Sequence, residues 1–521
     1  MTTFRNEPLL ELRREAVRRQ ALEALAALDA KLPLEVPMLI GDSVVTGRKF
    51  ASVDPSQPTR IVAHAHEATE QHVKDAIVSA ETGHKAWSRK PAADRAAALS
   101  RAAGILRSRR LELAALAVRE AGKPWAEADA DVCEAIDFLE YYAQGALALG
   151  EGRALLQLPG ERNAMRYVPR GVTGVIAPWN FPLAIACGMV SAALATGNAV
   201  VLKPAEQTPA SAKAVVDALH AGGVPLDALH LLPGGDEAGK ALVADPRIHT
   251  IAFTGSCAVG LQIIEQAAKV LPGQRHIKKV IAEMGGKNAI IVDSDADLDD
   301  VVPALLKSAF AFAGQKCSAA SRALVHAAIA DELAERMAGA VTTLRVGPAA
   351  DFATDVPPVI DVAAQQKIQR YIASATPLAQ AQAREDGFYV APTIFACLPS
   401  DSPVIQEEIF GPVLSLETVQ SIEHACDLVD ESPFALTGGL FSRSPRTIEY
   451  VSDRTPVGNL YVNREITGAM VGRQPFGGGR LSGTGPKAGG THYLTRFATE
   501  QTVTINTAAA GGNAALLSGE E

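Results

Sequence analysis

Between residues 170 and 300, short apolar runs alternate regularly with helical stretches. Segments such as GVTGVIAPWN, NAVVLKP and IHTIAFTG indicate strands, and the stretches between them, such as PLAIACGMVSAALATG, indicate helices. Continuous apolar strands that alternate with helices predict a parallel sheet with helices packed against it. A second series of the same kind follows residue 317, from SRALVHAAI to ALTGGLFS, so we expect an α/β protein with two such units.

Two segments depart from this alternation. Residues 153–171, RALLQLPGERNAMRYVPRG, alternate apolar and polar residues around a Pro-Gly turn, which predicts an antiparallel hairpin. From residue 496 the chain has the character of a further strand, and the tail over 511–521 is expected to be flexible. Because exposed strand edges favour pairing with another chain, we expect a homo-oligomer.

The overall charge and the cysteine pattern limit the kinds of partner. The formal net charge of −9 argues against a nucleic-acid-binding protein, which would normally present a basic face. The first 25 residues indicate a charged amphipathic helix without the apolar core of a signal peptide, and no apolar run reaches the ~18 residues of a membrane span. The six cysteines are scattered without a CxxC pair, so we expect a cytoplasmic protein with no metal site and no membrane partner.

Several polar residues stand where a strand is expected to end, which is the edge at which open α/β sheets bind ligands. Asn180 in VIAPWNFPLAI is a candidate oxyanion donor, although an asparagine in this position is also a common helix cap. Lys203 and Glu206 in LKPAEQTP suit the ribose hydroxyls of an adenosine, and the carboxylate favours NAD over NADP. In isolation, the same two residues are equally consistent with a surface ion pair.

Two more strand ends carry candidates. Gly255 and Ser256 in AFTGSCAVG stand between a strand and a helix, where backbone amides bind a pyrophosphate. The usual GxGxxG spacing is absent, and a turn without any ligand gives the same pattern. Glu283 in AEMGGKN precedes two glycines, so we expect its carboxylate to face open space and to act as a general base; the alternative is a surface glutamate.

Cys317 lies in FAGQKCSAA, among small residues that leave room for a ligand. A free cysteine is usually a small buried hydrophobic residue, and that interpretation suits Cys187 or Cys426. Lys316, directly before Cys317, would favour the thiolate if the two side chains approached each other. The stretch by itself leaves both a structural thiol and a nucleophile open.

Six motifs occur in one order over residues 178–412: PWNFP, KPAEQTP, FTGS, EMGGKN, GQKCS and EEIFGP. In this combination the chain resembles the aldehyde dehydrogenase superfamily, whose fold has a Rossmann-like NAD-binding domain, a second α/β catalytic domain and a small β oligomerisation flap. The resemblance implies NAD as the cofactor and a dimer as the unit of assembly. The boundaries it implies are 1–151 and 170–281 for the NAD-binding domain, 282–485 for the catalytic domain, and 152–169 with 486–510 for the flap.

The same resemblance implies a role for each matching residue. Cys317 matches the nucleophile that attacks the aldehyde carbon, Asn180 the oxyanion donor, and Glu283 the base that activates water to hydrolyse the thioester. The cofactor-binding residues that it implies are Ile176, Pro178, Trp179, Lys203, Glu206, Gly235, Gly239, Phe253, Thr254, Gly255, Ser256, Met284, Glu408 and Phe410.

The stretch ITGAMVGRQPFGG, within residues 463–490, together with QKCSA, is similar to the L-glutamate γ-semialdehyde dehydrogenases, also called 1-pyrroline-5-carboxylate dehydrogenases. This similarity implies NAD-dependent oxidation of that semialdehyde to L-glutamate in proline catabolism, and transient contact with a proline dehydrogenase. The implied substrate contacts fall into three groups. The amides of Gly468 and Ala469 and the hydroxyl of Ser318 bind the α-carboxylate, Phe181 and Phe476 flank the aliphatic stem, and Glu134 lies near the α-ammonium group.

Three other functions fit parts of the pattern. A dehydrogenase of another short acidic semialdehyde would use the same machinery. A cysteine hydrolase or acyltransferase would use Cys317, but no histidine lies near the catalytic motifs to serve as its base. A non-enzymatic scaffold would have no need to keep Cys317, Asn180 and Glu283 together.

Overall fold

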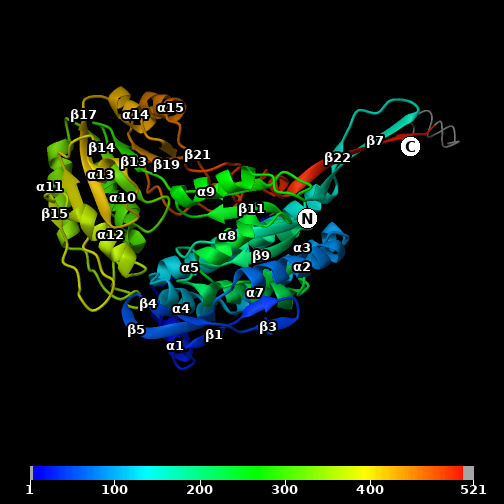
Figure 1. Cartoon of the computed structure of the whole chain (residues 1–521). Helices are drawn as coiled ribbons and strands as arrows, with labels where there is room; N and C mark the ends of the chain where they lie inside the picture. Colours follow the sequence, from blue (N-terminus) through cyan, green and yellow to red (C-terminus); the bar gives the residue numbers. More distant parts are fainter. Residues whose placement is uncertain (1–3, 508–521) are drawn as a thin grey trace.

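The computed structural model describes residues 4–507. Two sheets of seven strands each are surrounded by helices, and a ribbon of strands extends away from both (Figure 1). Within residues 4–507, no helix has both the length and the apolar character needed to cross a membrane. The flexible tail expected over 511–521 lies outside the described residues.

The first sheet has the strand order β12-β11-β8-β9-β10-β2-β3. Its strands from β8 to β12 are parallel to one another, while β2 and β3 are antiparallel additions at one edge. The parallel strands predicted over residues 170–283 are therefore confirmed. The strands are β2 (Met38–Ile40), β3 (Ser43–Val45), β8 (Val172–Ile176), β9 (Ala199–Lys203), β10 (Leu229–Leu231), β11 (Ile248–Thr254) and β12 (Lys279–Glu283).

Helices connect these strands in the order expected of a parallel sheet. They are α6 (Ala184–Ala195), α7 (Pro209–Gly222), α8 (Asp236–Ala244) and α9 (Cys257–Ala268). Helix α6 is buried on all sides, which explains its lack of any polar face, and it ends where Gly197 adopts a left-handed φ of 89°.

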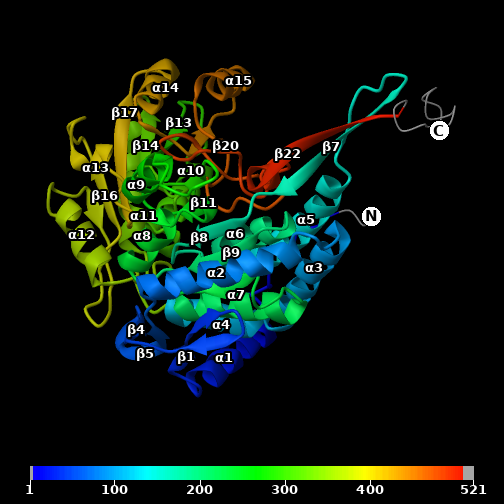
Figure 2. The ribbon, with the colours of Figure 1, turned by 45° about the vertical axis from the view of Figure 1, so that its right-hand side comes forward.

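The N-terminal part of the chain packs further helices around this sheet (Figure 2). They are α1 (Glu15–Asp29), α2 (Glu70–Trp87), α3 (Ala92–Ser108), α4 (Arg110–Glu120) and α5 (Trp125–Gly150). Helix α5 is central, because it contacts α3, α4 and α6 and buries most of its length. A separate small sheet has the order β1-β5-β4, with bounds Leu34–Val36, Gln57–His66 and Lys49–Asp54.

The helix expected over the first 25 residues begins only at Glu15, so that prediction was wrong for the residues before it. Residues 4–12 form an irregular segment instead. Its backbone amides at Glu7 and Leu10 donate to the side chains of Asp137 and Asp129 on α5, rather than to carbonyl groups of a helix of their own. Tertiary hydrogen bonds have therefore overridden the local helical pattern.

The second sheet has the order β15-β16-β17-β14-β13-β19-β20 and is parallel except for β15. Its strands are β13 (Asn288–Val292), β14 (Ala320–His326), β15 (Ala379–Gln380), β16 (Thr393–Ala396), β17 (Val413–Val419), β19 (Thr437–Phe441) and β20 (Asn459–Val462). The helices around it are α10 (Leu298–Phe310), α11 (Ala330–Thr342), α12 (Val362–Ile372), α13 (Pro403–Gln406), α14 (Ile422–Asp430) and α15 (Pro445–Arg454). The second α/β unit predicted after residue 317 is confirmed, and it begins one strand earlier, at β13.

The protruding ribbon consists of β22 (Ala498–Asn506), β7 (Glu161–Pro169) and β6 (Arg153–Ala154), in that order (Figure 1). The predicted hairpin over residues 153–171 is present, but its first strand has only two residues. The long pairing joins β7 to β22 over nine residues, because the strand near the C-terminus returns alongside it. Just before that strand, Tyr493, Leu494 and Phe497 are buried in the core beside the first sheet.

Candidate active site

The carboxyl ends of four parallel strands meet in one row. Ile176 at the end of β8 is paired with Lys203 of β9 on one side and with Phe253 of β11 on the other. Thr254 of β11 is in turn paired with Glu283 at the end of β12. The order in which strands are added reverses beside β8, because β9 and β10 follow on one side of it and β11 and β12 on the other. Open α/β sheets bind their ligands in the crevice at such a reversal.

Lys203 and Glu206 lie at one end of this row. The Lys203 ammonium is 3.3 Å from a carboxylate oxygen of Glu206, so the ion pair considered above does form. The Lys203 side chain is almost buried, whereas 43% of the Glu206 side chain stays exposed, and Gly235 leaves space beside its carboxylate. Gly239, on the first turns of α8, also faces open space. A carboxylate in this position can accept hydrogen bonds from ribose hydroxyls and repels a 2′-phosphate.

The turn from β11 into α9 contains Gly255 and Ser256. Ser256 caps α9 by accepting a hydrogen bond from the Val259 amide, and the first turn of this helix carries no acidic residue. A Cβ atom on Gly255 would lie 2.6 Å from the Phe253 ring, and one on Gly260 would lie 2.4 Å from the Met284 sulfur. The glycines are thus required by the packing beneath the turn, which leaves the helix N-terminus open to an anion such as a pyrophosphate.

The other end of the row carries Glu408, Phe410 and Trp179. A Glu408 oxygen accepts a hydrogen bond of 3.0 Å from the Gly286 amide, and burial raises the pKa of this carboxyl. Phe410 has a φ of 58° and meets Trp179 edge-on, with ring centroids 5.7 Å apart. Two carboxylates at opposite ends and an open helix N-terminus between them suit an extended dinucleotide, so these residues fit NAD.

Cys317 lies on a loop with an unusual backbone. The three residues Phe312, Ala313 and Gly314 have consecutive left-handed φ values of 52°, 54° and 68°. A Cβ atom on Gly314 would lie 2.3 Å from the Gly411 carbonyl oxygen, so only glycine fits there. Non-glycine residues in this conformation are strained, and such strain persists only where the surroundings hold it in place.

Asn180 and Asn288 hold this loop. The Asn180 amide donates to the Gln315 carbonyl at 3.1 Å, and Asn288 donates to the carbonyls of Cys317 and Ala319 at 2.7 and 2.9 Å. The alternative role of Asn180 as a helix cap is wrong, because α6 makes no side-chain cap hydrogen bond. Since an amide NH₂ group has two hydrogens, Asn180 retains one for an oxyanion beside Cys317. Asn288 is not among the residues predicted for the site, although it stands in the motif EMGGKN at the start of a strand.

The condition under which Lys316 would favour the Cys317 thiolate is not met. Its ammonium pairs with Glu127 at 2.7 Å and does not assist the neighbouring thiol. Burial, reinforced by the negative charges of Glu408, Glu283 and Glu134, raises the pKa of the Cys317 thiol to about 12. The thiol is therefore protonated at neutral pH in the free protein, and the negative charges that raise its pKa belong to the other predicted site residues.

Glu283 does not face open space, contrary to the expectation from its two following glycines. It is 8% exposed, and neither carboxylate oxygen has a hydrogen-bond partner of good geometry among residues 4–507. Glycines at 477 and 483 make room for it, because a Cβ atom on either would come within about 3 Å of the carboxylate. Burial raises the pKa of Glu283 well above its usual value, with only partial opposition from the Gly478 amide and Lys487.

Lys123, which is not among the predicted site residues, contacts the backbone of Asn180. The Lys123 side chain is fully buried, and its ammonium donates to the Asn180 carbonyl at 2.7 Å. It also lies 3.6 Å from Asp131 and 3.5 Å from the centre of the Phe181 ring. Asp131 in turn accepts a hydrogen bond from the Ala184 amide at the start of α6. In the sequence, Lys123 stands between Gly122 and Pro124 in a short connection between two helices. A lysine in such a connection is usually exposed, so the sequence does not indicate that this one is buried.

We expect Lys123→Met to lower the free energy of unfolding by about 3 kcal/mol, because it leaves the buried Asp131 without its counter-charge. Chemical denaturation would measure the change. The double variant Lys123→Met/Asp131→Asn should recover most of it. Lys74→Met, which removes half of an exposed helical ion pair, serves as the control and should change stability by less than about 0.5 kcal/mol. A stable Lys123→Met single variant would contradict the expectation.

Of the predicted substrate residues, Glu134 belongs to the same charged cluster as Lys123 and Asp131. Burial and the charges of Asp131 and Asp137 raise the pKa of Glu134 to about 8, while Lys123 and Lys316 oppose the shift. Gly468 has a φ of 79° with open space beside it, and Ala469 is half-buried. Ser318 is buried next to Cys317, and Phe476 is held by backbone hydrogen bonds to Ala488.

The chain matches a family model, curated proteins and solved structures. The family model described as "Aldehyde dehydrogenase family" matches residues 44–503. A curated protein from Geobacillus sp. (strain WCH70), named 1-pyrroline-5-carboxylate dehydrogenase, is 43% identical over 507 residues, which are 96% of this chain and 98% of that protein.

Solved structures agree with this similarity. A 1-pyrroline-5-carboxylate dehydrogenase from Thermus with bound NAD superposes with a TM-score of 0.94 and 40% identity, over 97% of this chain and 100% of that one. Proline utilization A from Bdellovibrio bacteriovorus superposes with a TM-score of 0.95 and 44% identity over 97% of this chain. Only 53% of that longer protein is covered, so the chain spans about half of its length.

Proposed function

The chain belongs to the aldehyde dehydrogenase family, and from this membership we propose that it oxidises L-glutamate γ-semialdehyde to L-glutamate with NAD as the hydride acceptor, in proline catabolism. The observation that carries the proposal is the hydrogen bond between Asn180 and the loop that contains Cys317. The side-chain amide of Asn180, which follows β8 of the first sheet, donates to a carbonyl two residues before Cys317, which precedes β14 of the second sheet. The two sheets therefore bring a candidate oxyanion donor and a candidate nucleophile together.

In the proposed reaction, the Cys317 thiol loses its proton to solvent as its sulfur forms a bond to the aldehyde carbon, and the remaining Asn180 hydrogen stabilises the oxyanion. When bound, NAD accepts the hydride that leaves this carbon. The resulting thioester is attacked by water, whose proton passes to the Glu283 carboxylate. The raised pKa of Glu283 makes it a stronger base than an exposed carboxylate, and its new proton passes to the Cys317 sulfur as that sulfur leaves and the acid is formed.

The substrate class is proposed from the charges around Glu134. Three carboxyl groups, at positions 127, 131 and 134, interact with the ammonium groups of Lys123 and Lys316, and Lys307 also acts on Glu127. The pKa of Glu134 stays raised in spite of these cations, so a ligand with its own ammonium group would supply the counter-charge that this carboxyl lacks. Backbone amides at Gly468 and Ala469, with the Ser318 hydroxyl, are proposed to receive the α-carboxylate, since this loop supplies donors without a cation.

NADH formation would test the proposal with three aldehydes. We expect kcat/KM to be highest with pyrroline-5-carboxylate, which hydrolyses to the semialdehyde. Succinic semialdehyde, which lacks the ammonium group, and propionaldehyde, which lacks both charged groups, should be poorer by about tenfold or more. Equal or better turnover of succinic semialdehyde would favour the alternative of another short acidic semialdehyde, and preference for propionaldehyde would overturn the proposed substrate.

The raised pKa of Glu134 predicts how ligand affinity changes with pH. Below about pH 8 this carboxyl is protonated in the free protein, and an ammonium ligand favours its charged form. Affinity for L-glutamate as a product inhibitor should therefore rise about tenfold between about pH 6 and about pH 8, and then level off. Glutarate has the same carbon chain without the ammonium group and should not show this rise. Parallel pH profiles for the two inhibitors would contradict the role of Glu134.

Assembly and location belong to the same proposal. The exposed strands of β6, β7 and β22 support pairing with a second copy, so the proposed unit is a dimer. Residues 1–151 and 170–281 are proposed as the NAD-binding domain, 282–485 as the catalytic domain, and 152–169 with 486–510 as the flap. The six free cysteines support a cytoplasmic setting, and the similarity to half of proline utilization A supports transient contact with a proline dehydrogenase.

A further inference from the structure

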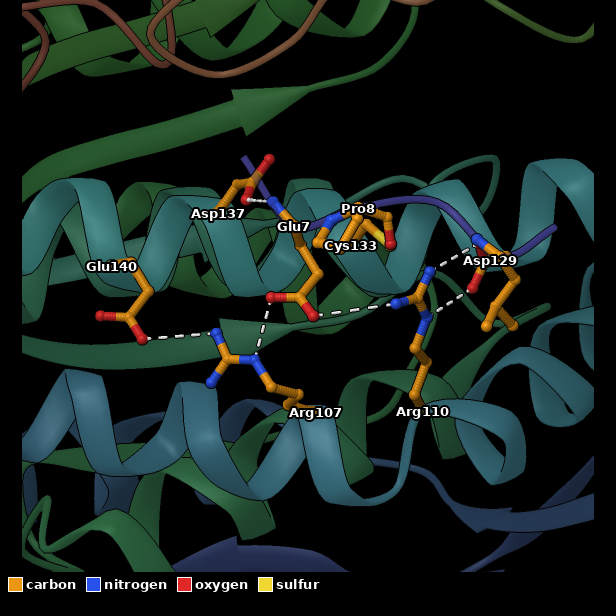
Figure 3. Close-up of polar contacts among 9 residues, drawn as sticks. Glu7, Pro8, Arg107, Arg110, Asp129, Cys133, Asp137 and Glu140 are labelled. Carbon is orange, nitrogen blue, oxygen red and sulfur yellow. Dashed lines mark hydrogen bonds and ion pairs between the residues drawn. The ribbon is translucent and has the colours of Figure 1, made fainter. Parts of the chain in front are cut away.

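The first described residues form a strap, residues 4–12, that lies along helix α5 (Figure 3). The Glu7 amide donates to Asp137 at 2.7 Å, and the Leu10 amide donates to Asp129 at 2.8 Å. Neither of these carboxylates belongs to the proposed catalytic groups. The strap therefore uses α5 as a support along more than two of its turns.

Asn6 connects α5 to the loop that contains Val471. Its side-chain amide donates one hydrogen bond to Asp137 on α5, at 2.8 Å, and another to the Val471 carbonyl, at 2.9 Å. Both hydrogens of the NH₂ group are thus used, one on each side. Val471 is almost completely buried, so its carbonyl lies where a lost partner is costly.

Phe4 reinforces the same junction. Its ring meets Tyr141 of α5 edge-on, with centroids 5.1 Å apart. A Cβ atom on Gly472 would lie 3.2 Å from each of these rings, so the loop after Val471 passes close over the pair. The strap therefore adds one amide and one aromatic contact between the loop 466–472 and α5, beside the buried packing of Val471 and the hydrogen bonds that link Gly472 through Gly489 to Tyr142 of α5.

The two elements joined in this way are the two sides of the proposed substrate pocket. Helix α5 carries Glu134 three residues before Asp137, and the loop carries Gly468 and Ala469 three and two residues before Val471. The distance between the site proposed for the ammonium group and the site proposed for the carboxylate thus depends on the Asn6 bridge. A misplacement of a fraction of an ångström at such a site weakens binding strongly.

We infer that Asn6 is a positioning residue that sets the separation between the loop 466–472 and Glu134, and so tunes the pocket to the two charged groups of an amino-acid aldehyde. This inference rests on the proposed function. Because Asn6 contacts no reacting group, its effect is confined to substrate recognition and leaves the chemistry at Cys317 unchanged.

The strap offers a matched control at the next residue. The Glu7 side chain pairs with Arg107 of α3 at 2.9 Å and lies 3.7 Å from Arg110 of α4, as Figure 3 shows. These contacts attach the strap to the helices on its other side and do not reach the loop 466–472. Glu7→Ala therefore loosens the strap without removing the Asn6 bridge.

The test compares the full-length protein with Asn6→Ala and Glu7→Ala, using pyrroline-5-carboxylate and propionaldehyde. We expect Asn6→Ala to raise KM for pyrroline-5-carboxylate about five- to tenfold, with kcat almost unchanged and KM for propionaldehyde within about twofold. Glu7→Ala should leave both KM values within about twofold, even where both variants lower Tm by a similar amount.

Equal KM changes for the two aldehydes, or equal effects of the two variants, would overturn the inference and leave the strap as a stabilising element only. Hydrogen exchange adds a readout that does not depend on substrate. Peptides covering residues 466–472 should exchange faster in Asn6→Ala than in Glu7→Ala, and unchanged exchange would also overturn the inference. A parent protein that does not oxidise pyrroline-5-carboxylate would overturn the proposed function, and with it the substrate role of Asn6.

Discussion

Replacing Cys317 with alanine should lower kcat for pyrroline-5-carboxylate by at least about 10⁴-fold, because no other group can form the bond to the aldehyde carbon. The affinity for NAD should change by less than about twofold, since the residues that fit the dinucleotide belong to other loops. NADH formation and NAD titration would measure the two quantities separately.

The other cysteines provide the control for this variant. Cys397 is exposed on the second α/β unit and has no part in the proposed reaction, so Cys397→Ser should keep the activity of the parent protein.

Alkylation of the parent with a labelled reagent should reach Cys317 faster at higher pH, because the thiolate becomes more abundant as pH rises towards a pKa of about 12. Activity that survives in Cys317→Ala would exclude covalent catalysis at this residue.

The second large effect is expected from Glu283→Gln, which keeps the shape of the side chain and removes the base. We expect a fall in kcat of about 10²- to 10⁴-fold through slow hydrolysis of the thioester, while hydride transfer continues. The variant should therefore show a burst of NADH close to one equivalent per active site, followed by a slow steady state.

Two observations would distinguish this from a general loss of structure. Hydroxylamine, a nucleophile that needs little help from a base, should restore turnover in Glu283→Gln but not in Cys317→Ala. Thermal stability should not fall, because burial disfavours the charged carboxylate of Glu283 and the amide is neutral. A variant without a burst would contradict the assignment of Glu283 to the hydrolytic step.

Much of the fold could be predicted because its signals are local. The apolar run that ends at Lys203 and the one that ends at Glu283 each define a strand within a few residues. Once both strands are parallel members of one sheet, their ends must lie at the same edge, and the register pairing Ile176 with Lys203 and Phe253 bears this out. The clustering of the candidates follows from the topology, without knowledge of any side-chain contact.

The failures share a different physical origin. Lys316 is adjacent to Cys317 in sequence, yet its side chain pairs with Glu127, 189 residues earlier. Asn6 bonds to a carbonyl 465 residues away, and Lys123 to one 57 residues away. Side-chain directions and long-range partners of this kind depend on how complete elements pack, so no window of the sequence contains them.

The two sides of the substrate pocket differ in how firmly they are built. On one side, Lys123 joins Asn180, Phe181 and Asp131 into a single buried unit that also fixes the start of α6. On the other, the loop 466–472 is attached to α5 by the neutral amide of Asn6, an aromatic contact and hydrogen bonds through Gly489, with no buried ion pair and with open space beside Gly468. Evolution towards new aldehydes would therefore proceed first by remodelling the loop, because a change in the opposite wall also disturbs the groups that hold Asn180 in place.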